Sequence, residues 1–169
     1  TLCMTAEQLA NAGGQQIPGA EHFILSALAL PDGTARRTFE RLRVDPAAFQ
    51  PAIEQQYAAA LAAVGLQAGV AAEALPDAVA VLPRKGMYQT QASAQALMAV
   101  LTRQVMVAAQ KANARTPLLG AHVLLAAAAA ERGVAARALR TLGIDRDQLV
   151  AAASAEVAAT LRSPTGPAS

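Results

Sequence analysis

Residues 22–45 read HFILSALALPDGTARRTFERLRVD, and residues 122–145 read HVLLAAAAAERGVAARALRTLGID. Placed one above the other without a gap, the two stretches are identical at nine of 24 positions. An alanine-rich chain produces chance alanine matches, but a histidine, a glycine and an aspartate that recur in register have no such explanation. The sequence therefore predicts two copies of one structural unit, offset by 100 residues.

Each copy is predicted to contain a series of short helices. In the first copy the apolar segment 22–30 forms one helix, and Gly33 interrupts it. A second helix is expected over 34–43, because its apolar residues recur at helical spacing. Asp45 is then placed to cap a third helix, and Pro46 occupies its first position, where proline is favoured.

The second copy repeats this pattern, with a break at Gly133 and with Asp145 as the cap of a helix over 146–161. A further helix is expected before each histidine, over 5–12 and 92–114. We therefore expect four helices per copy. We interpret the first helix of the chain as truncated, since its counterpart is about twice as long.

These helices divide the chain into four parts. Residues 1–64 are predicted to form the first repeat and residues 88–162 the second. The segment 65–87, with its prolines and glycines, is predicted to be a linker. Residues 163–169, which read SPTGPAS, are predicted to be a disordered tail.

The composition favours an all-α fold and excludes several classes of function. Hydrophobic residues make up 54% of the chain but aromatic residues only 3%, and alanine, the best helix former, supplies most of the difference. A net charge of +2 with no basic run argues against nucleic-acid binding. No unbroken apolar run reaches the roughly 18 to 20 residues of a membrane span, so we expect no membrane partner. The single cysteine, Cys3, cannot form an internal disulfide, which favours a cytoplasmic location.

Two motifs in the repeated units resemble a known family. Residues 19–25 read GAEHFIL and residues 120–125 read GAHVLL; each is followed by the glycine break, a helix and then an aspartate. This pattern resembles the Clp amino-terminal repeat, which occurs twice in the docking domain of Clp-type unfoldases such as ClpC. The resemblance covers nearly the whole chain. It implies an all-α, pseudo-two-fold bundle of eight helices, made of two four-helix Clp repeats, that receives substrates, adaptors or degrons.

The resemblance also suggests a ligand-binding position. In ClpC-like proteins the glutamate of each motif helps to bind phosphoarginine marks, and the first copy retains it as Glu21, next to Ala20 and Gly19. The second copy lacks one residue between Ala121 and His122, and with it the acid. At most one such site is therefore expected. The chain has no phosphate-binding loop of an ATPase, so it is either a stand-alone repeat protein or a fragment of an unfoldase.

Each candidate residue also has a purely structural interpretation. Glu21 at a helix start interacts favourably with the free N–H groups there, whether or not it binds a ligand. His22 and His122 are expected to pack or bond locally at their helix starts, since two histidines in separate repeats make no metal site.

The second helix of the first copy carries an arginine cluster, which is either a solvated face or a patch for an acidic partner. Its members are Arg36, Arg37 and Arg41. Met98 and Met106 are expected in the core.

The resemblance implies a protein-binding module of the Clp protease system that acts in substrate, adaptor or degron docking, including a role as an accessory or a decoy for the unfoldase. The sequence shows no catalytic motif, and we expect no enzyme activity, no cofactor and no metal. The alternatives are a structural accessory to the Clp peptidase core or, with less support, a small hydrolase that uses Glu21 or the histidines as acid–base groups.

Overall fold

The computed structural model describes residues 2–63, 65, 90–112 and 116–162. Within them the chain forms eight α-helices, one short 3-10 helix and no β-strand, which confirms the all-α prediction. The predicted linker and tail lie outside the described residues, apart from Gly65 at the start of the linker. The elements are α1 (Leu2–Ala12), α2 (Ala20–Leu28), α3 (Thr34–Arg41), η1 (Pro46–Ala48), α4 (Phe49–Ala63), α5 (Ala92–Ala112), α6 (Gly120–Ala127), α7 (Val134–Thr141) and α8 (Arg146–Arg162).

The predicted aspartate caps are present where η1 and α8 begin. A side-chain oxygen of Asp45 accepts the backbone N–H of Ala47 at 2.9 Å, and Pro46 opens the 3-10 turn that continues into α4. Asp145 accepts the N–H of Asp147 at 3.0 Å at the start of α8. Local sequence chemistry therefore places these two helix starts correctly.

The central helices begin two residues earlier than predicted. The apolar run suggested a start at His22, but α2 starts at Ala20 and ends at Leu28. The helix α6 likewise starts at Gly120, two residues before His122. The reason is that each histidine is the third residue of its helix and bonds back to the capping residue, so it lies inside the helix.

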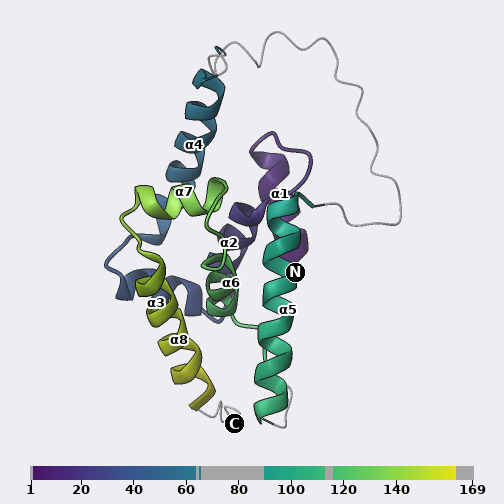
Figure 1. Ribbon diagram of the computed structural model, residues 1–169, viewed down its shortest axis with the longest axis vertical. Helices are drawn as coiled ribbons and strands as arrows, with labels where there is room; N and C mark the ends of the chain where they lie inside the picture. Colours follow the sequence, from purple (N-terminus) through teal and green to yellow (C-terminus); the bar gives the residue numbers. More distant parts are fainter. Residues whose placement is uncertain (1, 64, 66–89, 113–115, 163–169) are drawn as a thin grey trace, which may run out of the picture.

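Helices from the two halves of the chain pack against each other (Figure 1). The central contact joins α2 to α6, while α1 packs on α2 and α5 packs on α6. Farther out, α3 packs on α8 and α4 packs on α7. In Figure 1, α6 lies between α5 on one side and α3 and α8 on the other.

The core is built from few large side chains and many alanines. Phe23, Phe39 and Phe49 are completely buried, and the last two rings meet edge to face with centroids 5.9 Å apart. Alanine allows the helix backbones to approach closely, and Gly120 lies at one such close contact. A Cβ atom there would lie only 2.9 Å from the backbone oxygen of Ala27.

Helix α5 corrects one prediction from the sequence, the burial of Met106. An 18-residue window within Ala92–Lys111 of α5 has a mean hydropathy of 1.2, so by length and composition alone this helix could cross a membrane. The apolar residues of this helix form no unbroken run, because alanine, valine and leucine alternate with glutamine and threonine. Only 17% of this stretch is buried, and Met106, expected in the core, is 59% exposed. Met98 is partly buried against the core, as expected.

Candidate functional site

The predicted site lies at the amino-terminal end of α2, where His22 organises the helix start. Gly19 caps the helix in an extended conformation and donates its backbone N–H to Nδ1 of His22 at 3.0 Å. The ring is buried, and burial lowers its pKa, although the charge of Glu21 acts in the opposite direction. Because Nδ1 accepts the N–H of Gly19, it carries no proton, and the neutral ring holds its proton on Nε2.

The same arrangement occurs at the start of α6. Leu119 donates its backbone N–H to Nδ1 of His122 at 3.1 Å, and burial lowers the pKa of this ring as well. The nearby carboxylate of Asp32 opposes that shift. The prediction that both histidines bond locally at their helix starts is confirmed.

Glu21, the predicted ligand-binding acid, is buried and has a partner within the chain. Its side chain is 1% exposed, and Oε1 accepts the hydroxyl proton of Tyr57 at 2.5 Å. The carboxylate folds back over the capping residue, so a Cβ atom on Gly19 would lie 2.7 Å from Oε2. Only glycine fits at position 19 while the carboxylate keeps this position.

Tyr57 connects Glu21 to the surface. Its hydroxyl oxygen also lies 3.0 Å from Oε1 of Gln15, at the end of the segment that follows α1. Burial, together with the negative charge and hydrogen bond of Glu21, raises the pKa of the phenol. Tyr57 therefore stays protonated and keeps donating to the carboxylate.

A cavity of about 160 Å³ opens next to this pair. Gln15, His22, Glu54 and Tyr57 line it, together with apolar side chains of α1, α2 and α4. None of the three predicted residues at positions 19–21 lines it. The backbone N–H of Ala20 instead faces α5 and donates to Oγ of Ser93 at 3.2 Å. A ligand in the cavity would meet Tyr57 and Gln15 before Glu21.

The second copy holds an alanine where the first holds the acid. Glu21 and Ala121 are both the second residue of their helix, so the missing acid reflects a substitution. The deletion inferred from the sequence is wrong, because both helices start in the same register relative to their histidine. At this second helix start, Asp32 accepts the N–H of Gly120 at 3.2 Å and Thr34 accepts the N–H of Ala121 at 2.8 Å.

The predicted arginine cluster is already engaged inside the chain. Arg36 donates to the backbone oxygen of Leu28 at 2.9 Å. Arg37 and Arg41 both bind the carboxylate of Glu156 in α8; the Arg37 bond measures 2.7 Å. Glu156 is 3% exposed, while about half of each arginine side chain faces solvent. Burial would raise the pKa of Glu156, but the two arginines outweigh it and hold that pKa below its usual value.

A polar cluster at positions shifted by 100 makes the matching contact in the other half. Arg137 donates to Oε1 of Gln56 at 3.3 Å, and Gln56 donates through Nε2 to Oγ1 of Thr141 at 3.0 Å. These three residues stand 100 positions from Arg37, Glu156 and Arg41. Glu156, Gln56 and Tyr57 were not predicted as functional residues. The offset of 100 residues does identify Gln56 and Glu156 as matching positions of the two copies.

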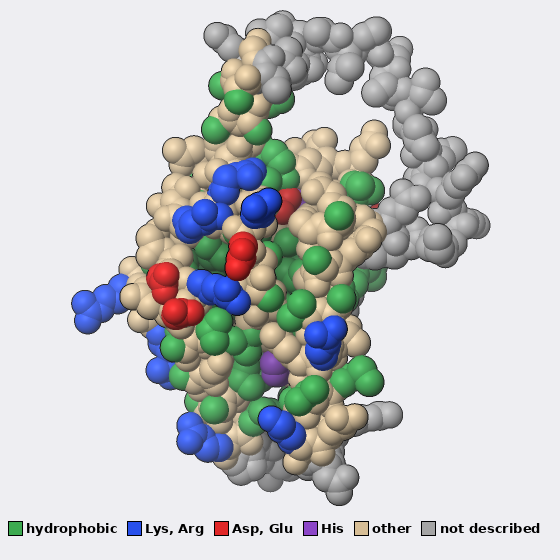
Figure 2. Space-filling model, viewed as in Figure 1, with side chains coloured by type: hydrophobic (Ala, Val, Ile, Leu, Met, Phe, Trp, Pro, Cys, Tyr) green, Lys and Arg blue, Asp and Glu red, His purple; other side chains and the backbone are tan. Residues whose placement is uncertain are grey.

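Charged side chains do not form one continuous patch on the face shown in Figure 2, where arginine and lysine side chains are scattered over several helices. Among the described residues, no group of three His, Cys, Asp or Glu side chains is placed to hold a metal ion.

Comparison with known proteins gives no relative from which a role could be transferred. No protein-family model matches the chain, and no curated protein matches it. The resemblance to the Clp repeat therefore depends on the motifs of the sequence itself.

Proposed function

We propose that this chain is a protein-binding module made of two Clp-type repeats, which docks clients, adaptors or the unfoldase of a Clp protease system. The strongest support is the set of hydrogen bonds that recurs at an offset of 100 residues. Each copy starts its central helix with a histidine Nδ1 cap. Each copy also directs an arginine of its third helix to the residue at the matching position in the fourth helix of the other copy.

The helix contacts support the same arrangement. If α1–α4 are exchanged with α5–α8 in order, the contact of α1 with α2 becomes that of α5 with α6, and the contact of α3 with α8 becomes that of α7 with α4. The central contact of α2 with α6 becomes itself. A pseudo-two-fold axis through the central contact has these properties, so we propose an eight-helix bundle of two four-helix repeats.

The chemistry of the candidate residues favours binding over catalysis. Both histidines use Nδ1 to accept a backbone N–H, and Glu21 is paired with Tyr57. A general base must accept a proton from its substrate, whereas Nδ1 of both histidines and Oε1 of Glu21 already accept hydrogen bonds from groups within the chain. We propose a module without a cofactor that acts in the cytoplasm, as the single cysteine suggests.

Phosphoarginine is the ligand that the resemblance suggests for Glu21, and the burial of this residue limits how it could bind. A guanidinium would have to replace the Tyr57 hydroxyl as the donor to Oε1. Because Ala121 occupies the matching position, only one such site is proposed per chain.

The proposal can be tested with purified components of a Clp system. The immobilised chain would be offered an unfolded client, the same client phosphorylated on arginine, the unfoldase and the peptidase, with and without free phosphoarginine. We expect capture of a client or of the unfoldase. Capture of the peptidase alone, insensitive to phosphoarginine, would instead indicate a structural accessory. Failure to capture any of the four would contradict a role in Clp docking.

A further inference from the structure

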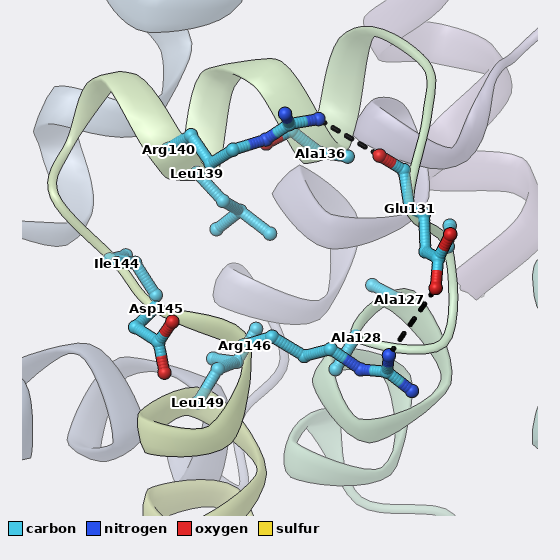
Figure 3. Close-up of a pocket in the computed structure, with 11 residues that line it drawn as sticks. Ala127, Ala128, Glu131, Ala136, Leu139, Arg140, Ile144, Asp145, Arg146 and Leu149 are labelled. Carbon is cyan, nitrogen blue, oxygen red and sulfur yellow. Dashed lines mark hydrogen bonds and ion pairs between the residues drawn. The ribbon is translucent and has the colours of Figure 1, made fainter.

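A second cavity, of about 290 Å³, lies between the end of α6, helix α7 and the start of α8 (Figure 3). Its walls are apolar and consist mainly of alanine and leucine side chains, with Leu139 and Leu149 the largest among them. Arg140, Arg146 and Glu131 stand at its rim, and Figure 3 shows Glu131 between the two arginines. The volume is close to the lower end of the range for ligand pockets, about 300 to 1,000 Å³.

The first copy fills the corresponding space with larger side chains. Phe39 and Phe49 are fully buried there, and their rings pack edge to face. The side chain of Arg36 reaches across to the backbone oxygen of Leu28. In the second copy every one of these positions carries a smaller residue: Ala128 replaces Leu28, Ala136 replaces Arg36, Leu139 replaces Phe39 and Leu149 replaces Phe49.

The scaffold thus accommodates phenyl rings in one copy and leaves a cavity in the other. The first copy builds this region from α2, α3 and α4, with η1 before α4, and the second copy builds it from α6, α7 and α8. A phenyl group from outside would therefore restore in the second copy the kind of side chain that fills the first.

The rim offers positive charge to such a ligand. Arg140 donates to the backbone oxygens of Ala136 and Glu131, at 3.2 and 2.9 Å. Arg146 lies 3.6 Å from the carboxylate of Glu131, but both side chains are largely exposed, so this pair is weak. Asp145 already accepts backbone N–H groups of α8. A carboxylate next to the phenyl group would complement the two arginines.

We propose that this cavity binds a phenylalanine side chain of a partner polypeptide, and that an acidic residue next to that phenylalanine contacts Arg140 and Arg146. The choice of a polypeptide depends on the proposed function. Aromatic anchors in pockets and arginines at their edge are the usual centres of binding energy in protein interfaces.

The test uses a fluorescein-labelled peptide with one phenylalanine between two glutamates, and fluorescence anisotropy with the full chain. Replacing the phenylalanine by alanine should weaken binding at least about tenfold. Replacing the glutamates by glutamine should weaken it severalfold and remove most of its dependence on salt. Equal affinity for the phenylalanine peptide and the alanine peptide would overturn the proposal. It would also be overturned if free N-acetylphenylalanine bound as tightly as the phenylalanine peptide.

Refilling the cavity provides the matching test on the protein. The double variant Ala128→Leu/Leu139→Phe restores the residues of the first copy and should abolish peptide binding, with Ala59→Leu on the exposed face of α4 as control. Arg140→Gln should weaken binding, while Arg162→Gln at the exposed end of α8 should not. Unchanged binding by the folded double variant would overturn the proposal. If that variant does not fold, two other results together would overturn the proposal. They are unchanged peptide binding by Arg140→Gln and equal affinity of the chain for the phenylalanine peptide and the alanine peptide.

The peptide-binding assay and the capture experiment together separate this inference from the proposed function. A chain that captures a Clp client but does not bind the phenylalanine peptide overturns the cavity assignment alone. A chain that binds the peptide but no Clp component supports the cavity and overturns the Clp role.

Discussion

Two histidines connect the stability of the fold to pH. Burial lowers the pKa of His22 and His122 below their ordinary value of about 6.5, and Nδ1 of each ring must stay unprotonated to accept its cap. Above about pH 6.5 their contribution is complete. As the pH falls below that value, the unfolded chain takes up protons that the native state does not bind, so the free energy of unfolding decreases.

Urea unfolding followed by circular dichroism at about pH 7.5 and about pH 5 would measure this loss. Glutamine at the same helix position can accept the capping N–H but does not titrate. The double variant His22→Gln/His122→Gln should therefore lose less stability between the two pH values than the wild type. An equal loss in both proteins would show that other groups cause the pH dependence.

The buried carboxylate of Glu156 provides a second prediction for a single residue. Replacing it by glutamine removes a charged acceptor from Arg37 and Arg41, and hydrogen bonds to charged groups contribute about 1.5 to 3 kcal/mol. Because both arginines are half-exposed, we expect a loss near the lower end, about 1.5 kcal/mol. The neutral counterpart is the control: Gln56→Ala should cost about 0.5 to 1 kcal/mol in the same denaturation assay. A larger loss for Gln56→Ala than for Glu156→Gln would contradict this account of the interface.

The contact between α6 and α2 depends on one glycine. A Cβ atom on Gly120 would lie 2.9 Å from both the oxygen of Ala27 and the Cβ of Ala35. Gly120→Ala should therefore push the two helices apart and cost about 1 to 3 kcal/mol, measured by thermal unfolding. At Gly13 the nearest atoms would be 3.5 Å away, so Gly13→Ala should change stability by less than about 0.5 kcal/mol. Similar effects of the two substitutions would refute the close approach.

Local chemistry explains which features of the helices could be predicted from sequence. Alanine content and the caps at Asp45 and Asp145 depend on residues only a few positions apart, and these predictions are confirmed. The predicted start of α2 was wrong by two residues, because the apolar run does not reveal that His22 accepts a hydrogen bond from the backbone N–H of Gly19.

The partners of the candidate residues were harder to predict. Tyr57 lies 36 positions from Glu21, and Glu156 lies 119 positions from Arg37. Spacing in the sequence carries no information on such pairs until the fold brings the helices together. The sequence singles out Glu21 and the arginines as candidates, but the burial of Glu21 and the internal partners of all of them follow only from tertiary packing.

For the molecule as a whole, the two proposed repeats would share a scaffold and differ in the side chains that they carry on it. The first copy has a buried acid next to a small cavity and a core closed by two phenylalanines. The second has an alanine in place of the acid and a larger cavity in place of the rings. Divergence of this kind would give the proposed docking module two different sites on one framework.

The most direct test of the docking proposal is a calorimetric titration of the chain with free phosphoarginine. We expect one site per chain for the wild type and for the control Glu7→Gln on the exposed face of α1. Glu21→Gln should bind at least about tenfold more weakly, a difference of about 1.4 kcal/mol. Two equal sites, or no binding by the wild type, would contradict a single inherited degron site at Glu21.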